Sequence, residues 1–126
     1  MKYIIKESDL DVAIMRYIEN IPELQNLEQF DCTSFDWDAG FDVEEICFQE
    51  DVDGYSVMSY YPYPENSKKI KNNDYKEELK YLPALKINDD DLVRTLNALF
   101  DFRWKKPFEK WFKTKYGLKV KTFYDF

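Results

Sequence analysis

Closely spaced carboxylates are the groups in this sequence best placed to do chemistry. In Asp36-Trp37-Asp38 two of them stand two residues apart, so an extended chain would put both on one face, as a site for a hard cation needs. Paired carboxylates also serve hydrolases, but one of the pair must then be buried with a raised pKa. Nothing in the sequence buries either side chain, and a solvated acidic loop is the simpler interpretation. We therefore predict no catalytic residue.

A second acidic motif, Asp51-Val52-Asp53-Gly54, matches the middle of a calcium-binding loop. In that register Gln49 takes the first position and Tyr60 the twelfth, so the first ligand and the bidentate glutamate are both missing. An Asp-Gly turn accounts for the motif without a metal. We expect neither a metal site nor a cofactor.

The chain of 126 residues contains no histidine. Histidine is the usual general base near neutral pH and the commonest metal ligand. Its absence excludes Ser-His-Asp and Cys-His nucleophile chemistry as well as histidine-containing zinc sites. A non-enzymatic protein is the prediction.

The two cysteines, Cys32 and Cys47, allow one disulfide, but reduced thiols are the simpler expectation. The first residues become charged before an apolar signal region forms, and no run is long enough to cross a bilayer. We predict a cytoplasmic protein without membrane contact, in the host cytoplasm if a virus encodes it.

Charge is segregated along the sequence. No Lys or Arg occurs from Tyr17 to Ser67, a stretch with thirteen acidic residues, whereas residues 68–126 carry fifteen basic residues against nine acidic ones. Either the two parts neutralise each other in the fold, or an acidic surface remains that steers a protein partner. We favour the second alternative. The predicted partner-binding residues are Asp36, Trp37, Asp38, Glu44 and Glu45.

Apolar residues at spacings of three and four predict three helices. The first follows an N-cap at Ser8, the second is capped by Asn88 or Asp89, and the third begins near Pro107. Their expected buried stripes are Leu10, Ala13, Ile14, Tyr17, Ile18 and Ile21; Leu92, Leu96, Leu99 and Phe100; and Phe108, Trp111, Phe112 and Tyr116.

Strands are predicted from alternation and from turn residues. An Asp-Gly turn joins Glu44–Glu50 to Tyr55–Tyr61 as a hairpin. Residues 23–42 have no clear pattern and are expected to be irregular, and Glu65–Lys80 is a surface loop or a short helix from Asp74 onward. The single strands are predicted at Lys2–Lys6, Leu82–Ile87 and Lys119–Tyr124.

Basic and aromatic residues alternate over Arg103–Lys121, as they do on surfaces that bind single-stranded nucleic acid. The rings of this segment share one helical stripe, however, which favours burial in a core. Nucleic-acid binding through this basic C-terminal helix is therefore an alternative function and not the first.

Both ends of the chain resemble small uncharacterised proteins of large tailed bacteriophages. The resemblance covers about a third of the chain and implies a viral origin, but no activity, cofactor or site residue. It is carried by Lys2-Tyr3-Ile4-Ile5-Lys6-Glu7-Ser8, Arg103-Trp104, Phe108-Glu109-Lys110-Trp111-Phe112, Tyr116-Gly117-Leu118 and Val120-Lys121-Thr122-Phe123-Tyr124.

Together these patterns predict one small α+β domain over residues 1–126. Its antiparallel sheet would consist of the N-terminal strand, the central hairpin and the C-terminal strand, packed by about three helices. The predicted function is non-catalytic, inhibitor-like binding of a protein partner through the acidic surface. A structural or accessory part of a larger assembly, such as a virion, is the alternative. The sequence does not indicate the oligomeric state.

Overall fold

The computed structural model describes residues 7–37, 40–64 and 73–124, so the predicted strand Lys2–Lys6 lies outside the described residues. Contacts along the chain divide it into two compact units. Residues 1–25 and 89–119 form a helical unit, and residues 26–88 and 120–126 form a sheet unit. Helices together with a mostly antiparallel sheet confirm the predicted α+β class.

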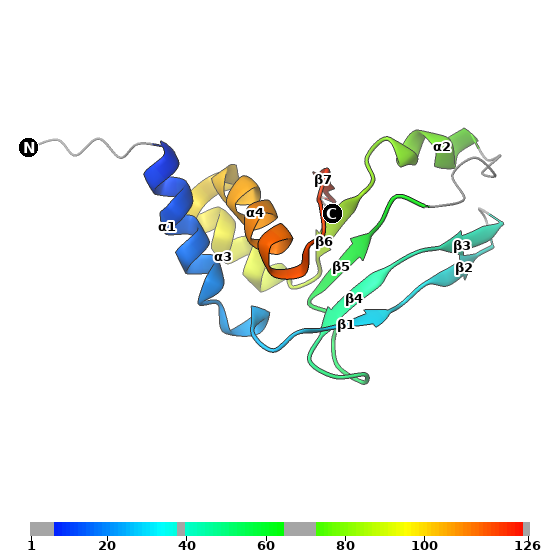
Figure 1. The fold of residues 1–126 in the computed structure, drawn as a ribbon, viewed down its shortest axis with the longest axis horizontal. Helices are drawn as coiled ribbons and strands as arrows, with labels where there is room; N and C mark the ends of the chain where they lie inside the picture. Colours follow the sequence, from blue (N-terminus) through cyan, green and yellow to red (C-terminus); the bar gives the residue numbers. More distant parts are fainter. Residues whose placement is uncertain (1–6, 38–39, 65–72, 125–126) are drawn as a thin grey trace, which may run out of the picture. The chain divides into compact units, whose positions relative to one another are not determined.

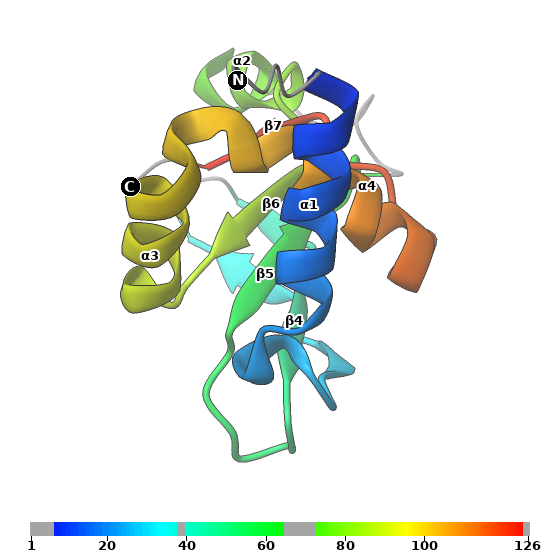
Figure 2. The same ribbon diagram turned by 90° about the vertical axis from the view of Figure 1, so that its left-hand side faces the viewer.

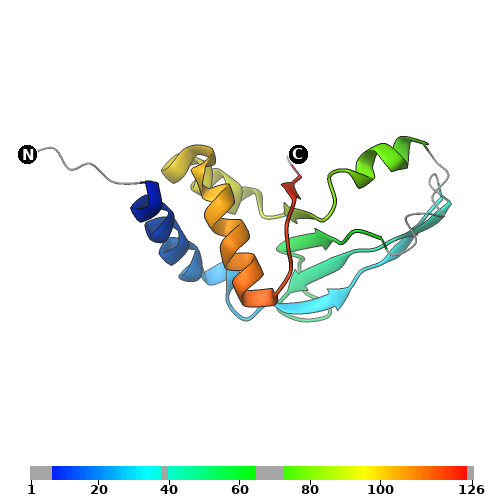
Figure 3. The same cartoon turned by 45° about the horizontal axis from the view of Figure 1, so that its top comes forward.

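The helical unit contains the three predicted helices, α1 (Glu7–Glu19), α3 (Asp90–Phe100) and α4 (Lys105–Tyr116), with short 3-10 turns η1 (Pro22–Leu24) and η3 (Asp101–Trp104) (Figure 2). Helix α1 packs against α4 (Figure 3). Asp89 caps α3 by accepting a hydrogen bond from the Leu92 amide at 3.1 Å, as predicted.

Two helix starts differ from the prediction. Helix α1 begins at Glu7, so Ser8 lies inside the first turn and is not the N-cap. Helix α4 begins at Lys105, two residues before Pro107. Proline is still tolerated there, because the first turn of a helix has no intrahelical partner for its amide groups.

The core of the helical unit follows the predicted stripes with three exceptions. Ile14, Ile18, Leu96, Phe108 and Phe112 are completely buried. Leu99, by contrast, is 54% exposed, and Ala13 and Tyr17 of α1 are exposed as well, so the predicted burial of these three residues is wrong. The chain leaves α3 soon after Leu99, at Asp101 with φ of 53°, and the buried stripe of this helix ends one turn earlier than the spacing predicts.

Among the described residues, the sheet unit contains a five-stranded sheet with the strand order β1-β4-β5-β6-β7 (Figure 1). The strands are β1 (Glu28–Asp31), β4 (Ile46–Gln49), β5 (Met58–Tyr61), β6 (Ala84–Ile87) and β7 (Thr122–Phe123), with the short helix α2 (Asn73–Leu79) between β5 and β6. The predicted hairpin is confirmed as β4 and β5. Strand β7 pairs parallel to β6, which corrects the purely antiparallel sheet expected.

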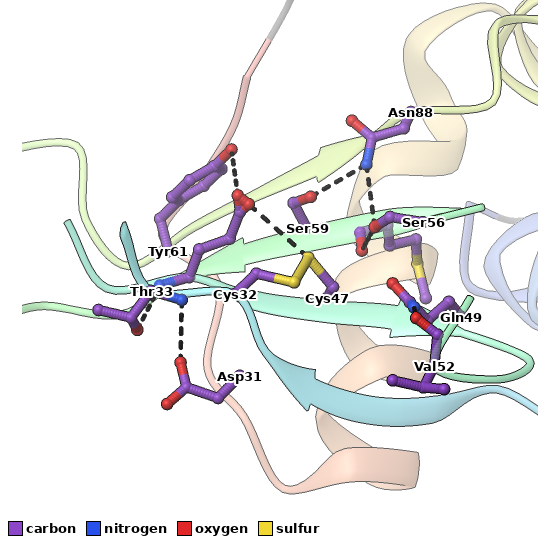
Figure 4. The surroundings of a disulfide bond; sticks show 12 residues. Asp31, Cys32, Thr33, Cys47, Gln49, Val52, Ser56, Ser59, Tyr61 and Asn88 are labelled. Carbon is purple, nitrogen blue, oxygen red and sulfur yellow. Dashed lines mark hydrogen bonds between the residues drawn. A yellow bond between two sulfur atoms is a disulfide. The ribbon is translucent and has the colours of Figure 1, made fainter. Parts of the chain in front are cut away.

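Polar groups buried in this sheet are matched by hydrogen bonds. Gln49 donates to the carbonyls of Asp51 and Val52, and Asn88 donates to the hydroxyls of Ser56 and Ser59 (Figure 4). Satisfied polar groups avoid the desolvation penalty of unpaired ones, and they help to fix the strands in one register.

The segment 23–42 is not irregular, contrary to the prediction. It contains β1 and β2 (Ser34–Asp36), and β2 pairs with β3 (Phe41–Val43). The β2–β3 pairing keeps the register of the β1–β4 pairing, so residues 28–36 and 41–49 form one long antiparallel ribbon. Between the two pairings the Thr33 amide donates a hydrogen bond to Asp31 Oδ1 at 2.9 Å. This amide therefore does not contribute to the hydrogen bonds between the strands.

The outer part of this ribbon, Ser34–Val43, is called the arm below; within the described part of the chain, its two strands pair only with each other. It continues β1 and β4 beyond the five-stranded sheet (Figure 1). At its tip the Gly40 amide donates to the Asp36 carbonyl at 2.8 Å, and Gly40 has φ of 80°, which favours glycine because other residues are strained there.

Candidate protein-binding arm

A disulfide between Cys32 and Cys47 closes the base of the arm (Figure 4). The Cys32 amide donates to the Glu45 carbonyl at 2.8 Å, so Cys32 lies diagonally across the ribbon from Cys47, with 5.9 Å between their Cα atoms. This distance is typical of disulfides. The expectation of reduced thiols is therefore wrong.

Two aromatic rings are exposed on the arm. Trp37 is 88% exposed and Phe35 is 47% exposed, and their ring centroids are 4.9 Å apart in an edge-to-face contact. Asp42 is directly opposite Phe35 in the register, so it lies on the same face of the two strands. Trp37 and Phe35 thus form an apolar knob beside a carboxylate.

The predicted site residues do not share one surface. Asp36 alternates with Phe35 along β2 and therefore lies on the opposite face of the arm from the two rings. Glu44 and Glu45 are half-buried just after β3. Asp38 lies outside the described residues.

Glu45 belongs to the base of the arm. Its Oε1 accepts a hydrogen bond from the Tyr61 hydroxyl at 3.4 Å, and its Oε2 lies 3.8 Å from Cys47 Sγ. Burial, reinforced by the nearby Glu45 charge, raises the pKa of Tyr61 to about 12. Tyr61 therefore stays neutral and available as a donor at physiological pH.

The negative charge of the sequence gathers in the sheet unit. This unit has fifteen acidic and seven basic residues, a net charge of −8, against +1 for the helical unit with ten acidic and eleven basic residues. Among the residues that the structure describes, neither Asp42 nor Glu44 forms an ion pair. The ion pair Glu77–Lys80 joins α2 to the residue that follows it, and Asp91–Arg94 lies within α3, so both are local pairs.

The residue types and spacings did not assign Phe35, Tyr61 or the two cysteines to the site. The alternation Phe35-Asp36-Trp37 was a signal for a two-faced strand and so for the ring pair. The disulfide and the Tyr61–Glu45 contact depend on the register of the ribbon, which two isolated cysteines do not reveal.

The acidic motif at Asp51–Gly54 and the aromatic rings of α4 have structural explanations. Asp51 accepts a hydrogen bond from the Asp53 amide at 3.0 Å, which is a turn contact. Within the described ranges there is no cluster of three or more Cys, Asp or Glu side chains that could hold a metal ion. Phe108, Trp111 and Phe112 of α4 are buried, so these rings are not available to stack on bases.

None of the helices in the described part of the chain has the length and apolar content that crossing a bilayer requires. Comparison with protein families, curated proteins and solved structures finds no match to this chain. The resemblance to bacteriophage proteins therefore stays a prediction.

Proposed function

We propose that this chain is a non-catalytic protein-binding module that engages a partner through the face of the arm carrying Phe35, Trp37 and Asp42. The observation that carries the proposal is the exposure of Trp37, at 88%, on a two-stranded arm closed by a disulfide. Trp37 contacts the exposed ring of Phe35, so the two form a contiguous apolar patch of the kind that marks interaction sites, and Trp is among the residues enriched at binding hot spots.

The disulfide adds to the case because it reduces the cost of binding. A two-stranded hairpin alone is marginally stable in water. Cross-linking its base limits the conformations that would have to be lost on binding, so more of the contact energy appears as affinity. The absence of any basic residue from Tyr17 to Ser67 favours a partner with a basic surface around an apolar pocket.

The test is a pull-down with tagged protein, followed by calorimetry with each purified candidate. Trp37→Ala should weaken binding by about 2 kcal/mol or more, the scale of a hot-spot residue. Phe102→Ala is the matched control, because Phe102 is also an exposed aromatic, at 70%, but lies in the helical unit. A partner that binds Trp37→Ala as tightly as the wild type would refute the proposal.

Charge reversal at Asp36, Asp38 and Glu44 tests the acidic contribution, and we expect slower association and a weaker loss of association rate as salt increases. Glu45 is left intact because reversing it would break its contact with Tyr61. A virion or other assembly as the partner would give the same result for the arm, so the identity of the captured protein separates these alternatives.

The proposal keeps the cytoplasmic location expected from the sequence, in a bacteriophage-infected host. The disulfide is the observation against it, because the cytosol keeps most thiols reduced. The test is to alkylate free thiols at the moment of cell lysis and to measure the mass of the protein by mass spectrometry. Only the reduced protein gains the mass of the alkyl groups, so the result shows which redox state is present in cells.

A further inference from the structure

The disulfide Cys32–Cys47 lies at the boundary between the supported and the unsupported part of the ribbon. Strand β4, which contains Cys47, is hydrogen-bonded to β1 on one side and to β5 on the other. The arm lies beyond the disulfide, and within the described ranges its two strands of three residues each pair only with each other. A hairpin this short is marginally stable at best without further support. Opening the disulfide should therefore loosen the arm while the sheet keeps its own hydrogen bonds.

The two sulfurs differ in access. Cys47 is 6% exposed, whereas Cys32 is half-buried. Cys32 directly follows β1, which is an edge strand of the five-stranded sheet. Disulfides open by attack of a thiolate on one sulfur, and access limits which sulfur is attacked. An incoming thiol therefore reaches Cys32 more readily than Cys47.

Glu45 makes the difference between the cysteines larger. Its Oε2 lies 3.8 Å from Cys47 Sγ, and the Tyr61 hydroxyl donates to its Oε1 at 3.4 Å (Figure 4). A disulfide sulfur has no hydrogen to donate, but after reduction the Cys47 thiol can donate to this carboxylate. The same charge repels a Cys47 thiolate, which is the reactive form. In the reduced protein, Cys47 is therefore held as an unreactive thiol.

We propose that the disulfide is a redox switch of the arm, opened and closed at Cys32 by a small thiol of the glutathione class. Only the disulfide form then presents the arm in the conformation that binds a partner, and this last step rests on the proposed function. The switch itself needs no partner and can be tested without one.

The exchange is balanced by two molecules of the small thiol. The first attacks Cys32 Sγ as a thiolate, the bond between the two protein sulfurs breaks, and the electron pair leaves with Cys47 Sγ, which takes a proton from water. The second attacks the mixed disulfide, which releases the Cys32 thiol and the disulfide of the small thiol. The protein disulfide is thereby reduced by two electrons, and two small thiols are oxidised.

The first test compares Cys47→Ser with Cys32→Ser. Each variant lacks the disulfide and retains one thiol, so the two are matched. Oxidised glutathione is the probe, and mass spectrometry follows the mixed disulfide. Cys32 should react at least about tenfold faster than Cys47 in the folded chains, because thiolate character and access set the rate. The two rates should become similar in denaturant. Equal rates in folded chains, with folding checked by circular dichroism, would overturn the assignment to Cys32.

Glu45→Gln tests the carboxylate because it removes the charge and keeps an acceptor oxygen. In the Cys32→Ser chain it should raise the rate at Cys47 about threefold or more, since a repelling charge next to the thiolate is lost. Glu44→Gln is the matched control, because the contact with Cys47 is made by Glu45. It should change this rate less than about twofold. Equal effects of the two variants would overturn the role of the Glu45 contact.

The second test measures amide hydrogen exchange in the wild-type chain before and after reduction by glutathione. Exchange in β2 and β3 should become at least about tenfold faster, whereas exchange in β4 and β5 should change less than about twofold. Exchange in the arm that does not change on reduction would overturn the switch.

Binding of the captured partner tests the last step. The reduced wild type should bind at least about tenfold more weakly than the disulfide form, because the arm must then be ordered on binding. Equal binding by both forms would overturn the control of binding by the switch, even if Trp37→Ala weakens binding. A partner that ignores Trp37→Ala would refute the proposed function and leave the thiol and exchange results standing.

Discussion

The three tryptophans of the chain occupy opposite environments. Trp37 is 88% exposed, whereas Trp104 and Trp111 are 3% and 5% exposed. The Trp104 indole also donates to Asn97 Oδ1 at 2.7 Å, and Trp111 contacts the ring of Phe108 at a centroid distance of 5.1 Å. One residue type thus serves the core of the helical unit and the surface of the arm.

This contrast predicts unequal effects on stability. Trp111→Ala should lower the free energy of unfolding by about 3–5 kcal/mol, because it empties a buried aromatic site. Trp37→Ala should change it by less than about 0.5 kcal/mol, as surface substitutions do. Guanidinium denaturation of the two variants measures both values, and a cost above about 1 kcal/mol for Trp37→Ala would show that the ring supports the fold.

Tyr61 predicts a loss of stability at alkaline pH. Its pKa is about 12 in the folded chain against an ordinary value of 10.0, so folding favours the neutral phenol. This contribution is complete below pH 10, where the phenol is neutral in both states, and is lost as the pH rises through 12. The free energy of unfolding should therefore fall between these pH values.

Tyr61→Phe removes the titrating group, so its free energy of unfolding should fall less steeply over this range. Urea denaturation at a series of pH values checks the slope, with Tyr63→Phe as control because Tyr63 is exposed. Parallel curves for wild type and Tyr61→Phe would show that Tyr61 contributes nothing to the alkaline transition.

At the scale of elements, the arm depends on its cross-link. The cysteines are 15 residues apart, and closing a loop of this length stabilises a fold by about 3 kcal/mol. Replacing both cysteines by alanine should therefore lower the free energy of unfolding by about this amount. Amide hydrogen exchange over Ser34–Val43 should also become faster, while exchange in α4 should not change.

Thiol titration of the denatured protein provides the control for this experiment. Unreduced protein should show no free thiol, and protein treated with a reductant should show two. Two thiols before reduction would contradict the pairing of Cys32 with Cys47.

The helices were predictable because their signals are local. The spacing of Leu92 and Leu96 and the cap at Asp89 lie within a few residues of one another, and both are as expected. The same holds for the β4–β5 hairpin, in which the Asp-Gly turn lies between the two strands.

The arm was not predictable in this way. Its strands Ser34–Asp36 and Phe41–Val43 are three residues long each and contain a single β-branched residue, Val43, so the local signal for a strand is weak. Their pairing comes from the register set by β1 and β4 and from the disulfide, which act across the chain. The exposed Trp37 could be singled out from sequence, but the ring pair and the face it occupies needed this register.

At the scale of the whole molecule, all of the excess negative charge lies in the sheet unit, at −8 against +1 for the helical unit. Like charges repel, and salt screens exposed charges over about 10 Å at 0.1 M ionic strength. We expect the melting temperature of the full chain to rise as sodium chloride increases from about 0.01 to 0.3 M. A falling melting temperature would mean that attractive charge pairs outweigh the repulsion.

The uninterrupted register from β1–β4 into β2–β3 makes the length of the arm adjustable. Inserting two residues into each strand near the tip would lengthen it by about 7 Å and return Trp37 to the face it occupies now. Inserting one residue into each strand would keep the strands paired but would turn the ring to the other face. An even number of inserted residues per strand therefore changes only the length of the arm, whereas an odd number also changes the face on which Trp37 lies. Neither insertion alters the sheet that supports the arm.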